Sequence, residues 1–263
     1  MRKWAWLLAL LVLWNILGYA MARSRPRAPL VVSSDTSAPS RIVAVAPNLV
    51  EILYALGLGE AVVGVTADSA SPPAAADKPK IGTFWQPNIE AIVALNPDLV
   101  VALDFQQHKS LVHRLERMGY ACLIADIWKV DDFFRGVVTI GQAAAREPQA
   151  EARVADIQAQ LQRLRDATTG QTRPRVLWVV QREPLRVAGQ DTFINELIEL
   201  AGGQNAIGPT LHKYPPIGAE QVISCGAEVI IEPAMVTGNL SQQRQQAQAY
   251  WSRWPHVPAV EAD

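Results

Sequence analysis

The sequence predicts an α/β fold in which two Rossmann-like lobes, each with a mostly parallel sheet, are joined by a single long helix. Short apolar runs alternate with helical segments before residue 147 and again after residue 173. This alternation is typical of parallel strands covered on both faces by helices. Residues 147–169 contain a helical pattern that no glycine breaks. Its larger apolar residues form one stripe, namely Val154, Ile157, Leu161 and Leu164.

The N-terminal α/β lobe is expected at residues 41–146. We expect its strands at 41–46, 61–65, 98–103 and 121–126, and its helices at 47–57, 88–95 and 111–119. In the first of these helices, Asn48 and Glu51 have the spacing of a capping box, which predicts Asn48 as the N-cap.

The C-terminal lobe is expected at residues 173–263, after the inter-lobe helix of residues 147–169. We expect strands at 175–180 and 227–232, and helices at 192–203, 220–226 and 240–251. In a fold of this kind a ligand binds between the lobes, at the carboxyl ends of the strands.

Composition excludes several classes of protein. The chain has 263 residues and a formal net charge of −1, so bulk neutralisation of nucleic-acid phosphates is excluded. Its 2 cysteines, Cys122 and Cys225, cannot build a disulfide-rich scaffold or a four-thiolate zinc site. They fall in different lobes, and we expect them to be buried free thiols.

The N-terminus indicates export from the cytoplasm. Arg2 and Lys3 precede an uncharged apolar run that ends at Ala20-Met21-Ala22, which is the order of a signal peptide with its cleavage site. An uncleaved membrane anchor at residues 1–22 is the alternative, because the run is long enough to span a bilayer. Residues 23–40 are rich in Pro, Ser and Arg and read as a flexible tether. Either reading places the folded body outside the cytoplasm, in the periplasm.

Three segments carry a resemblance to a known family. They are RIVAVAPNLVEILYALGLGEAVVGV (41–65), IGTFWQPNIEAIVALNPDLVVA (81–102) and PLRVAGQDTFINELIELAGGQNAI (184–207). With this order of motifs the chain resembles the substrate-binding proteins of metal-chelate ABC importers, the helical-backbone class that serves cobalamin, ferric siderophores and haem. The resemblance covers residues 41–260. Relatives continue beyond the equivalent of residue 263 with another strand and a helix, so we expect either a fragment or an incomplete C-terminal lobe.

Several residues are candidates for contact with a ligand. Phe84, Trp85 and Tyr214 lie in loops, where aromatic side chains suit a flat and largely apolar macrocycle. The resemblance implies that these three approximately match aromatic residues of cobalamin receptors and that Pro184-Leu185 forms a pocket wall. Pro47 and Asn48 occupy the turn after the first strand, which either lines the cleft or only begins the helix.

Two glutamates are candidates for docking to a membrane permease. Glu90 and Glu220 each lie in the opening turn of a helix, one in each lobe, where a carboxylate also stabilises the helix dipole. The resemblance implies that matching glutamates bind arginines of the ABC-transporter permease.

No catalytic or metal-binding residue is predicted. The turn Ala46-Pro47-Asn48-Leu49 lacks the glycines of a dinucleotide site, and His108 and His113 are wrongly spaced for a shared metal. The resemblance implies a monomeric receptor without a cofactor, whose ligand, most simply cobalamin, is itself a chelated metal. A ferric-siderophore or haem receptor is the alternative. A periplasmic enzyme or a non-binding tethered scaffold on the same fold is the second alternative.

Overall fold

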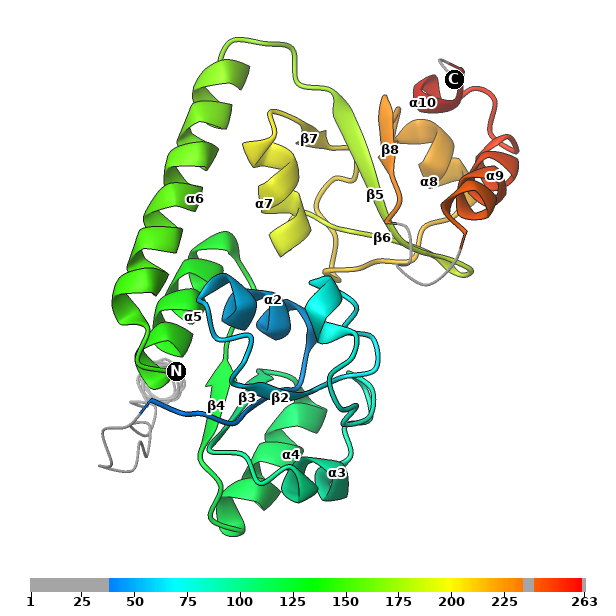
Figure 1. Ribbon diagram of the computed structural model, residues 1–263. Helices are drawn as coiled ribbons and strands as arrows, with labels where there is room; N and C mark the ends of the chain where they lie inside the picture. The colour runs from blue at the N-terminus through cyan, green and yellow to red at the C-terminus, as the bar shows by residue number, and fades with distance from the viewer. Residues whose placement is uncertain (1–37, 234–238, 262–263) are drawn as a thin grey trace, which may run out of the picture. The chain divides into compact units, whose positions relative to one another are not determined.

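A four-stranded parallel sheet organises the N-terminal lobe of the computed structural model, which describes residues 38–233 and 239–261. The sheet has the order β2-β1-β3-β4, and every strand pair in it is parallel (Figure 1). Its strands are β1 (Ile42–Ala44), β2 (Val62–Val65), β3 (Leu99–Leu103) and β4 (Cys122–Ala125). The predicted α/β class is confirmed.

Helices cover both faces of this sheet. They are α2 (Pro47–Ala55), η1 (Pro73–Ala75), α3 (Ile89–Ala94), α4 (Gln106–Arg117) and α5 (Val130–Ala143). Figure 1 shows α3 and α4 on one face of the sheet and α2 and α5 on the other.

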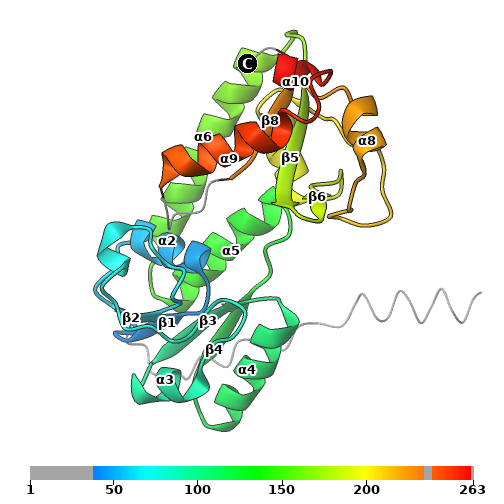
Figure 2. The ribbon, with the colours of Figure 1, turned by 90° about the vertical axis from the view of Figure 1, so that its right-hand side faces the viewer.

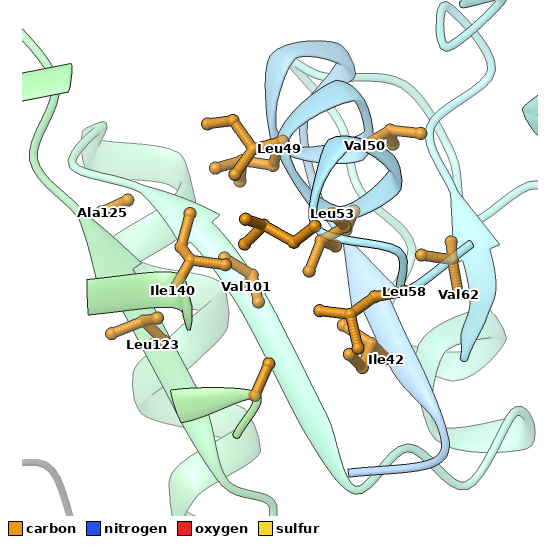
Figure 3. Close-up of a cluster of buried hydrophobic side chains, with 14 of the residues drawn as sticks. Ile42, Leu49, Val50, Leu53, Leu58, Val62, Val101, Leu123, Ala125 and Ile140 are labelled. Carbon is orange, nitrogen blue, oxygen red and sulfur yellow. The ribbon is translucent and has the colours of Figure 1, made fainter. Parts of the chain in front are cut away.

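Alternation of side chains along each strand divides the apolar core of this lobe into two layers. Ile42 and Val101 point toward α2 and α5, where they meet Leu53 and Ile140 (Figure 3). Their chain neighbours Val43, Val100 and Ala102 face the opposite way and pack with α3 and α4. Because both faces are covered, all five residues of β3 are buried, which explains why its sequence shows no polar alternation.

The long helix α6 extends from Glu147 to Thr168. Of its residues, Ala150 is buried and Val154 packs against the core of the first lobe, whereas Leu164 is exposed. The helix therefore rests on α5 at its beginning and is largely solvated further along.

The C-terminal lobe is built around the long strand β5 (Arg175–Arg182). The strand pairs in parallel with β7 (Gln204–Asn205) and β8 (Val229–Ile231), and antiparallel with β6 (Leu185–Val187). The sheet is thus mostly parallel, and its antiparallel member follows a tight connection at Glu183–Pro184.

Helices also flank both sides of the second sheet. They are α7 (Phe193–Leu200), α8 (Ala219–Ser224), α9 (Leu240–Trp251) and α10 (Pro258–Glu261). Figure 1 shows α7 on one side and α8 and α9 on the other, and Figure 2 shows α9 lying along its side of the sheet. Leu177 and Val179 of β5 pack with Val222 of α8 and Trp251 of α9.

The structure corrects the prediction that Asn48 caps the first helix. The N-cap is Ala46, whose backbone is extended, and no side chain caps this end. Pro47 takes the first helical position, where its missing N–H costs nothing and its fixed φ suits the helix. Asn48 is consequently already inside the helix, so its side chain is not placed at the cap.

Two further sequence predictions concern the chain's relation to a membrane. The predicted signal peptide or anchor at residues 1–22 lies outside the described residues. Within the described ranges, no helix has both the length and the apolar character needed to cross a bilayer.

Candidate ligand-binding site

Aromatic side chains gather where the strands of the first sheet end. Phe105 follows β3 after one residue, and Trp128 follows β4 after a short connection. Phe84 and Trp85 lie in the loop between β2 and α3. Because the strands are parallel, the segments that follow β3 and β4 emerge at the same edge of the sheet.

The rings form a connected cluster. The Phe84 ring centroid lies 4.8 Å from that of Trp85 and 5.3 Å from that of Phe105, in edge-to-face geometry. Phe105 in turn lies 5.4 Å from Trp128. Phe84 and Phe105 pack against the hydrophobic core, whereas Trp85 and Trp128 remain 68% and 39% exposed. The two tryptophans therefore offer ring surface to a ligand, and the two phenylalanines support them.

A buried histidine lies beneath this cluster. His108 of α4 is fully buried, and its ring is 4.9 Å from that of Phe84. Its Nδ1 accepts a hydrogen bond from the backbone N–H of Leu103 at 3.3 Å, and its Nε2 lies 2.9 Å from the carbonyl oxygen of Phe84. Burial lowers the pKa of His108 below its ordinary value, so the ring is neutral near pH 7.

The loop that carries Trp85 is closed on itself. Gly82 and Pro87 pair as an antiparallel bridge, and the N–H of Thr83 donates to the carbonyl of Gln86. Gly82 has φ +91°, and a Cβ there would lie 2.4 Å from the Gln86 carbonyl oxygen, so only glycine fits. Residues 82–87, which we call the Trp85 loop, thus form a tight excursion with the two aromatic residues at its tip.

The second lobe contributes Tyr214, whose side chain is 39% exposed. Its carbonyl accepts a hydrogen bond from the Arg186 guanidinium at 3.3 Å, and partial burial raises the pKa of its phenol. The adjacent Lys213 places its ammonium 5.2 Å from the centroid of the Trp128 ring. This cation–π contact brings the Tyr214 segment to the edge of the aromatic cluster.

Segment 128–130 also makes polar contacts with the second lobe. The N–H of Val130 donates to a carboxylate oxygen of Glu196 at 2.7 Å. Lys129 forms an ion pair with Asp191 at 3.2 Å, which raises the pKa of the lysine. The turn that presents Trp128 is therefore tied to residues at and just before α7 of the second lobe.

The remaining predicted ligand residues lie in different environments. Pro184 is exposed at the turn between β5 and β6, and Pro47 is half-buried at the start of α2. Asn48 is exposed. Leu185 is buried in the core of the second lobe, so its side chain packs inward.

Glu90 and Glu220 occupy matching positions. Each is the second residue of a six-residue helix, α3 or α8, and each is exposed in its first turn. Each helix also follows a proline in an isolated bridge, Pro87 or Pro216.

Neither the cysteines nor the potential metal ligands form a site in the part of the chain that the structure describes. Cys122 and Cys225 are free, but only Cys225 is buried as predicted, since Cys122 is half-buried. Desolvation raises the pKa of both thiols, that of Cys122 to about 12. Among the residues that the structure describes, no group of three or more His, Cys, Asp and Glu side chains could hold a metal ion.

The fold and the sequence together assign the family. Residues 42–263 match the family described as periplasmic binding protein. The chain belongs to that family.

Similar proteins include the vitamin B12-binding protein of Pectobacterium carotovorum, which is 25% identical over 233 residues. That match covers 88% of this chain and 83% of the relative. The vitamin B12-binding protein of Vibrio campbellii is 24% identical, with the same coverage of both chains.

Solved structures show the same fold. The periplasmic vitamin B12 binding protein BtuF of Vibrio cholerae aligns with a TM-score of 0.68 and 24% identity, covering 86% of each chain. The periplasmic heme-binding protein RhuT from Roseiflexus sp. RS-1 aligns with a TM-score of 0.73 and 24% identity, covering 85% of this periplasmic binding protein and 86% of RhuT.

Sequence reasoning missed three members of the aromatic cluster. Phe105 and Trp128 each follow a predicted strand after one intervening residue, so the rule that ligands bind at the carboxyl ends of parallel strands could have found them. His108 had no comparable signal, because its role depends on a contact with Phe84, 24 positions earlier in the chain.

Proposed function

We propose that this periplasmic binding protein captures a metal chelate outside the cytoplasm and delivers it to an ABC-transporter permease, with cobalamin as the ligand. The observation that carries the proposal is the pair of exposed rings of Trp85 and Trp128 on supporting phenylalanines, with the exposed Tyr214 next to Lys213 at the edge of this cluster. Flat aromatic faces bind a corrin or porphyrin ring by stacking and by excluding water.

The similar proteins named for vitamin B12 binding support cobalamin as the ligand ahead of haem or a ferric siderophore. The vitamin B12-binding relatives match nearly the whole folded body of this chain. Haem-binding proteins share the fold, so a haem or ferric-siderophore receptor is the alternative. The proposed mechanism is capture and release, without catalysis and without a resident cofactor, by a monomer.

Titration of cobalamin, haem and a ferric hydroxamate against the purified protein tests this proposal through quenching of tryptophan fluorescence. We expect cobalamin to quench at micromolar concentration and Trp85→Ala or Trp128→Ala to weaken binding about tenfold, since stacked aromatic residues dominate such contacts. Met118→Ala is the matched control, because Met118 is exposed at the far end of α4. Quenching by the ferric chelate alone would contradict cobalamin as the ligand.

We further propose that Glu90 and Glu220 dock the receptor onto one arginine in each half of the permease. Their exposure, their shared position in a short helix and their occurrence in both lobes support this role. A charge-assisted Arg–Glu pair on each lobe would fix the orientation of the receptor on the transporter.

Charge reversal separates docking from a purely helix-stabilising role. In cells that depend on this receptor, Glu90→Lys with Glu220→Lys should abolish uptake, because an interfacial arginine that loses its partner costs about 3 to 5 kcal/mol. Ligand affinity of the purified double variant should stay unchanged. Glu151→Lys, an exposed reversal on α6, is the control. Normal uptake by the double variant would reject the docking role.

We also propose that residues 1–22 are a signal peptide that directs export of the protein and is then cleaved. An uncleaved membrane anchor is the alternative. N-terminal sequencing of the protein from the cell envelope tests it. Cleavage gives a chain that begins at Arg23, whereas an anchored protein keeps Met1 and stays with the membrane fraction.

A further inference from the structure

We infer that His108 is a positioning residue that fixes the exposed Trp85 ring in its ligand-binding orientation by donating a hydrogen bond to the Phe84 carbonyl. The ring of His108 bridges two backbone groups, the N–H of Leu103 at the end of β3 and the carbonyl of Phe84 in the Trp85 loop. It therefore ties a surface loop to the end of a buried strand.

The two hydrogen bonds determine the tautomer. A backbone N–H can only donate, so the Nδ1 atom that faces Leu103 carries no proton. The proton of the neutral ring is then on Nε2, where it points at the Phe84 carbonyl oxygen 2.9 Å away. Both ring nitrogens are thus satisfied inside a fully buried side chain.

The tip of the Trp85 loop has few other ties to the lobe. The N–H of Phe84 donates to the carboxylate of Asp68 at 3.3 Å, and Asp68 is exposed. At the base of the loop the carbonyl of Gly82 accepts from the N–H of Ala67, and the other hydrogen bonds of the tip run between Thr83 and Gln86. The contacts to Asp68 and between Thr83 and Gln86 are exposed, whereas the His108 bond is part-buried, so removing its donor leaves the Phe84 carbonyl without this partner.

The rings transmit this constraint to Trp85. Phe84 lies edge-to-face on both His108 and Phe105, with centroids 4.9 and 5.3 Å apart. Trp85 follows Phe84 in the chain and stacks edge-on against it at 4.8 Å. Fixing the Phe84 backbone therefore fixes the direction of the Trp85 side chain before a ligand arrives, which lowers the entropy cost of binding.

A pair of substitutions separates the two bonds of His108, because each variant keeps one of them. His108→Gln places an amide N–H near the position of Nε2 and keeps the donor to Phe84. His108→Asn places an amide oxygen near the position of Nδ1, which keeps the acceptor for Leu103 and removes the donor. Both variants lose the aromatic ring, so a role in packing alone predicts faster exchange around Phe105 as well as around Phe84, since the ring contacts both.

Hydrogen–deuterium exchange of residues 83–86 is the first measurement, and it needs no ligand. We expect exchange to accelerate about tenfold in His108→Asn and by less than about twofold in His108→Gln, because only the former loses the bond. Equal acceleration in the two variants, or none in either, would overturn the inference.

The second measurement is affinity, and this arm rests on the proposed function. With cobalamin as the probe, we expect affinity to fall about tenfold in His108→Asn and to be retained in His108→Gln. If the wild-type protein binds neither cobalamin, haem nor the ferric hydroxamate, the proposed function fails while the exchange contrast still supports the positioning role.

A nitrogen-15 spectrum of the wild-type histidine side chains covers the case in which His108→Asn does not fold. A proton on Nε2 and none on Nδ1 of His108 supports the inference. A proton on Nδ1 would overturn it, since Nδ1 could then not accept from Leu103.

Discussion

In the first lobe the sheet lies between two apolar layers, whereas in the second lobe an apolar cluster on one side is combined with a buried polar network on the other. The first lobe alternates Ile42, Ala44 and Val101 with Val43 and Val100 across its sheet. The second lobe places Leu177 and Val179 in its cluster with α8 and α9.

The polar network of the second lobe involves three buried side chains. Asn205 donates to the carbonyl of Ala188 and to the side-chain oxygen of Asn195, and it accepts from the N–H of Ile207. Thr192 accepts from the N–H of Asn195 at the start of α7. These bonds fix the chain at Asn205, shortly after the glycine pair Gly202-Gly203.

The difference teaches how each half of the candidate site is held. Hydrophobic contacts are non-directional, so the first lobe adds a directional bond from His108 to orient Trp85. In the second lobe, backbone bonds place the segment before α8, since Gly189 and Val187 donate to the carbonyls of Lys213 and Pro215. Tyr214 lies between those two anchors.

The largest expected effect is on stability, from a cavity in the two-layered core. Leu53→Ala, at the centre of the cluster in Figure 3, should lower the free energy of unfolding by about 4 kcal/mol. Leu185→Ala should cost about 2 kcal/mol, because this side chain lies at the margin of its cluster. Urea denaturation measures both, and an equal cost would contradict the contrast between the cores.

The next effect concerns the polar network. Asn205→Ala should destabilise the protein by about 3 kcal/mol, because it leaves the Ala188 carbonyl and the Ile207 N–H buried without this partner. The exposed neighbour Gln204 is the control, and Gln204→Ala should cost less than about 0.5 kcal/mol. A neutral Asn205→Ala would show that the network does not stabilise the lobe.

Much of the fold could be predicted because its signals are local. The buried strand β3 and the helix α9 were expected from short apolar runs and helical periodicity, and the structure has β3 at Leu99–Leu103 and α9 at Leu240–Trp251. Helix α4 begins at Gln106, earlier than the predicted start at residue 111. Its first turn was missed because that turn is polar and buries only His108. Helix α5 was not predicted, and Asp132 fixes its start by accepting from the N–H groups of Trp128 and Lys129.

The candidate site was only partly predictable. Loop aromatics such as Trp85 and Tyr214 are visible as residue types in turns. Whether a loop side chain points inward or outward depends on distant packing, and Leu185, which the resemblance placed in a pocket wall, packs in the core of the second lobe. The role of His108 depends on two backbone groups that only the folded chain brings together.

A pH effect should distinguish the two lobes. Burial lowers the pKa of His108 in the folded protein, so the unfolded chain binds more protons below about pH 6.5. The contribution of His108 to the free energy of unfolding is therefore fully present above that pH. It is lost as the pH falls toward the pKa of His108 in the folded protein. Urea denaturation between pH 7.5 and pH 5 measures the loss, which His108→Gln should remove. The exposed His256 of the second lobe is the control, and His256→Gln should leave the loss in place.

The smallest expected effect compares two helix caps. The side chain of Asn88 accepts from the N–H of Ala91 at the start of α3, and that of Asn239 accepts from Ser241 and Gln242 at the start of α9. Asn88→Ala should cost about 1 kcal/mol, because a six-residue helix depends strongly on its first turn. Asn239→Ala should cost less, about 0.5 kcal/mol, because α9 is held at its other end by buried Tyr250 and Trp251. Denaturation midpoints of the two variants give the comparison. A larger loss at Asn239 would mean that α9 depends on its cap more than on these aromatic contacts.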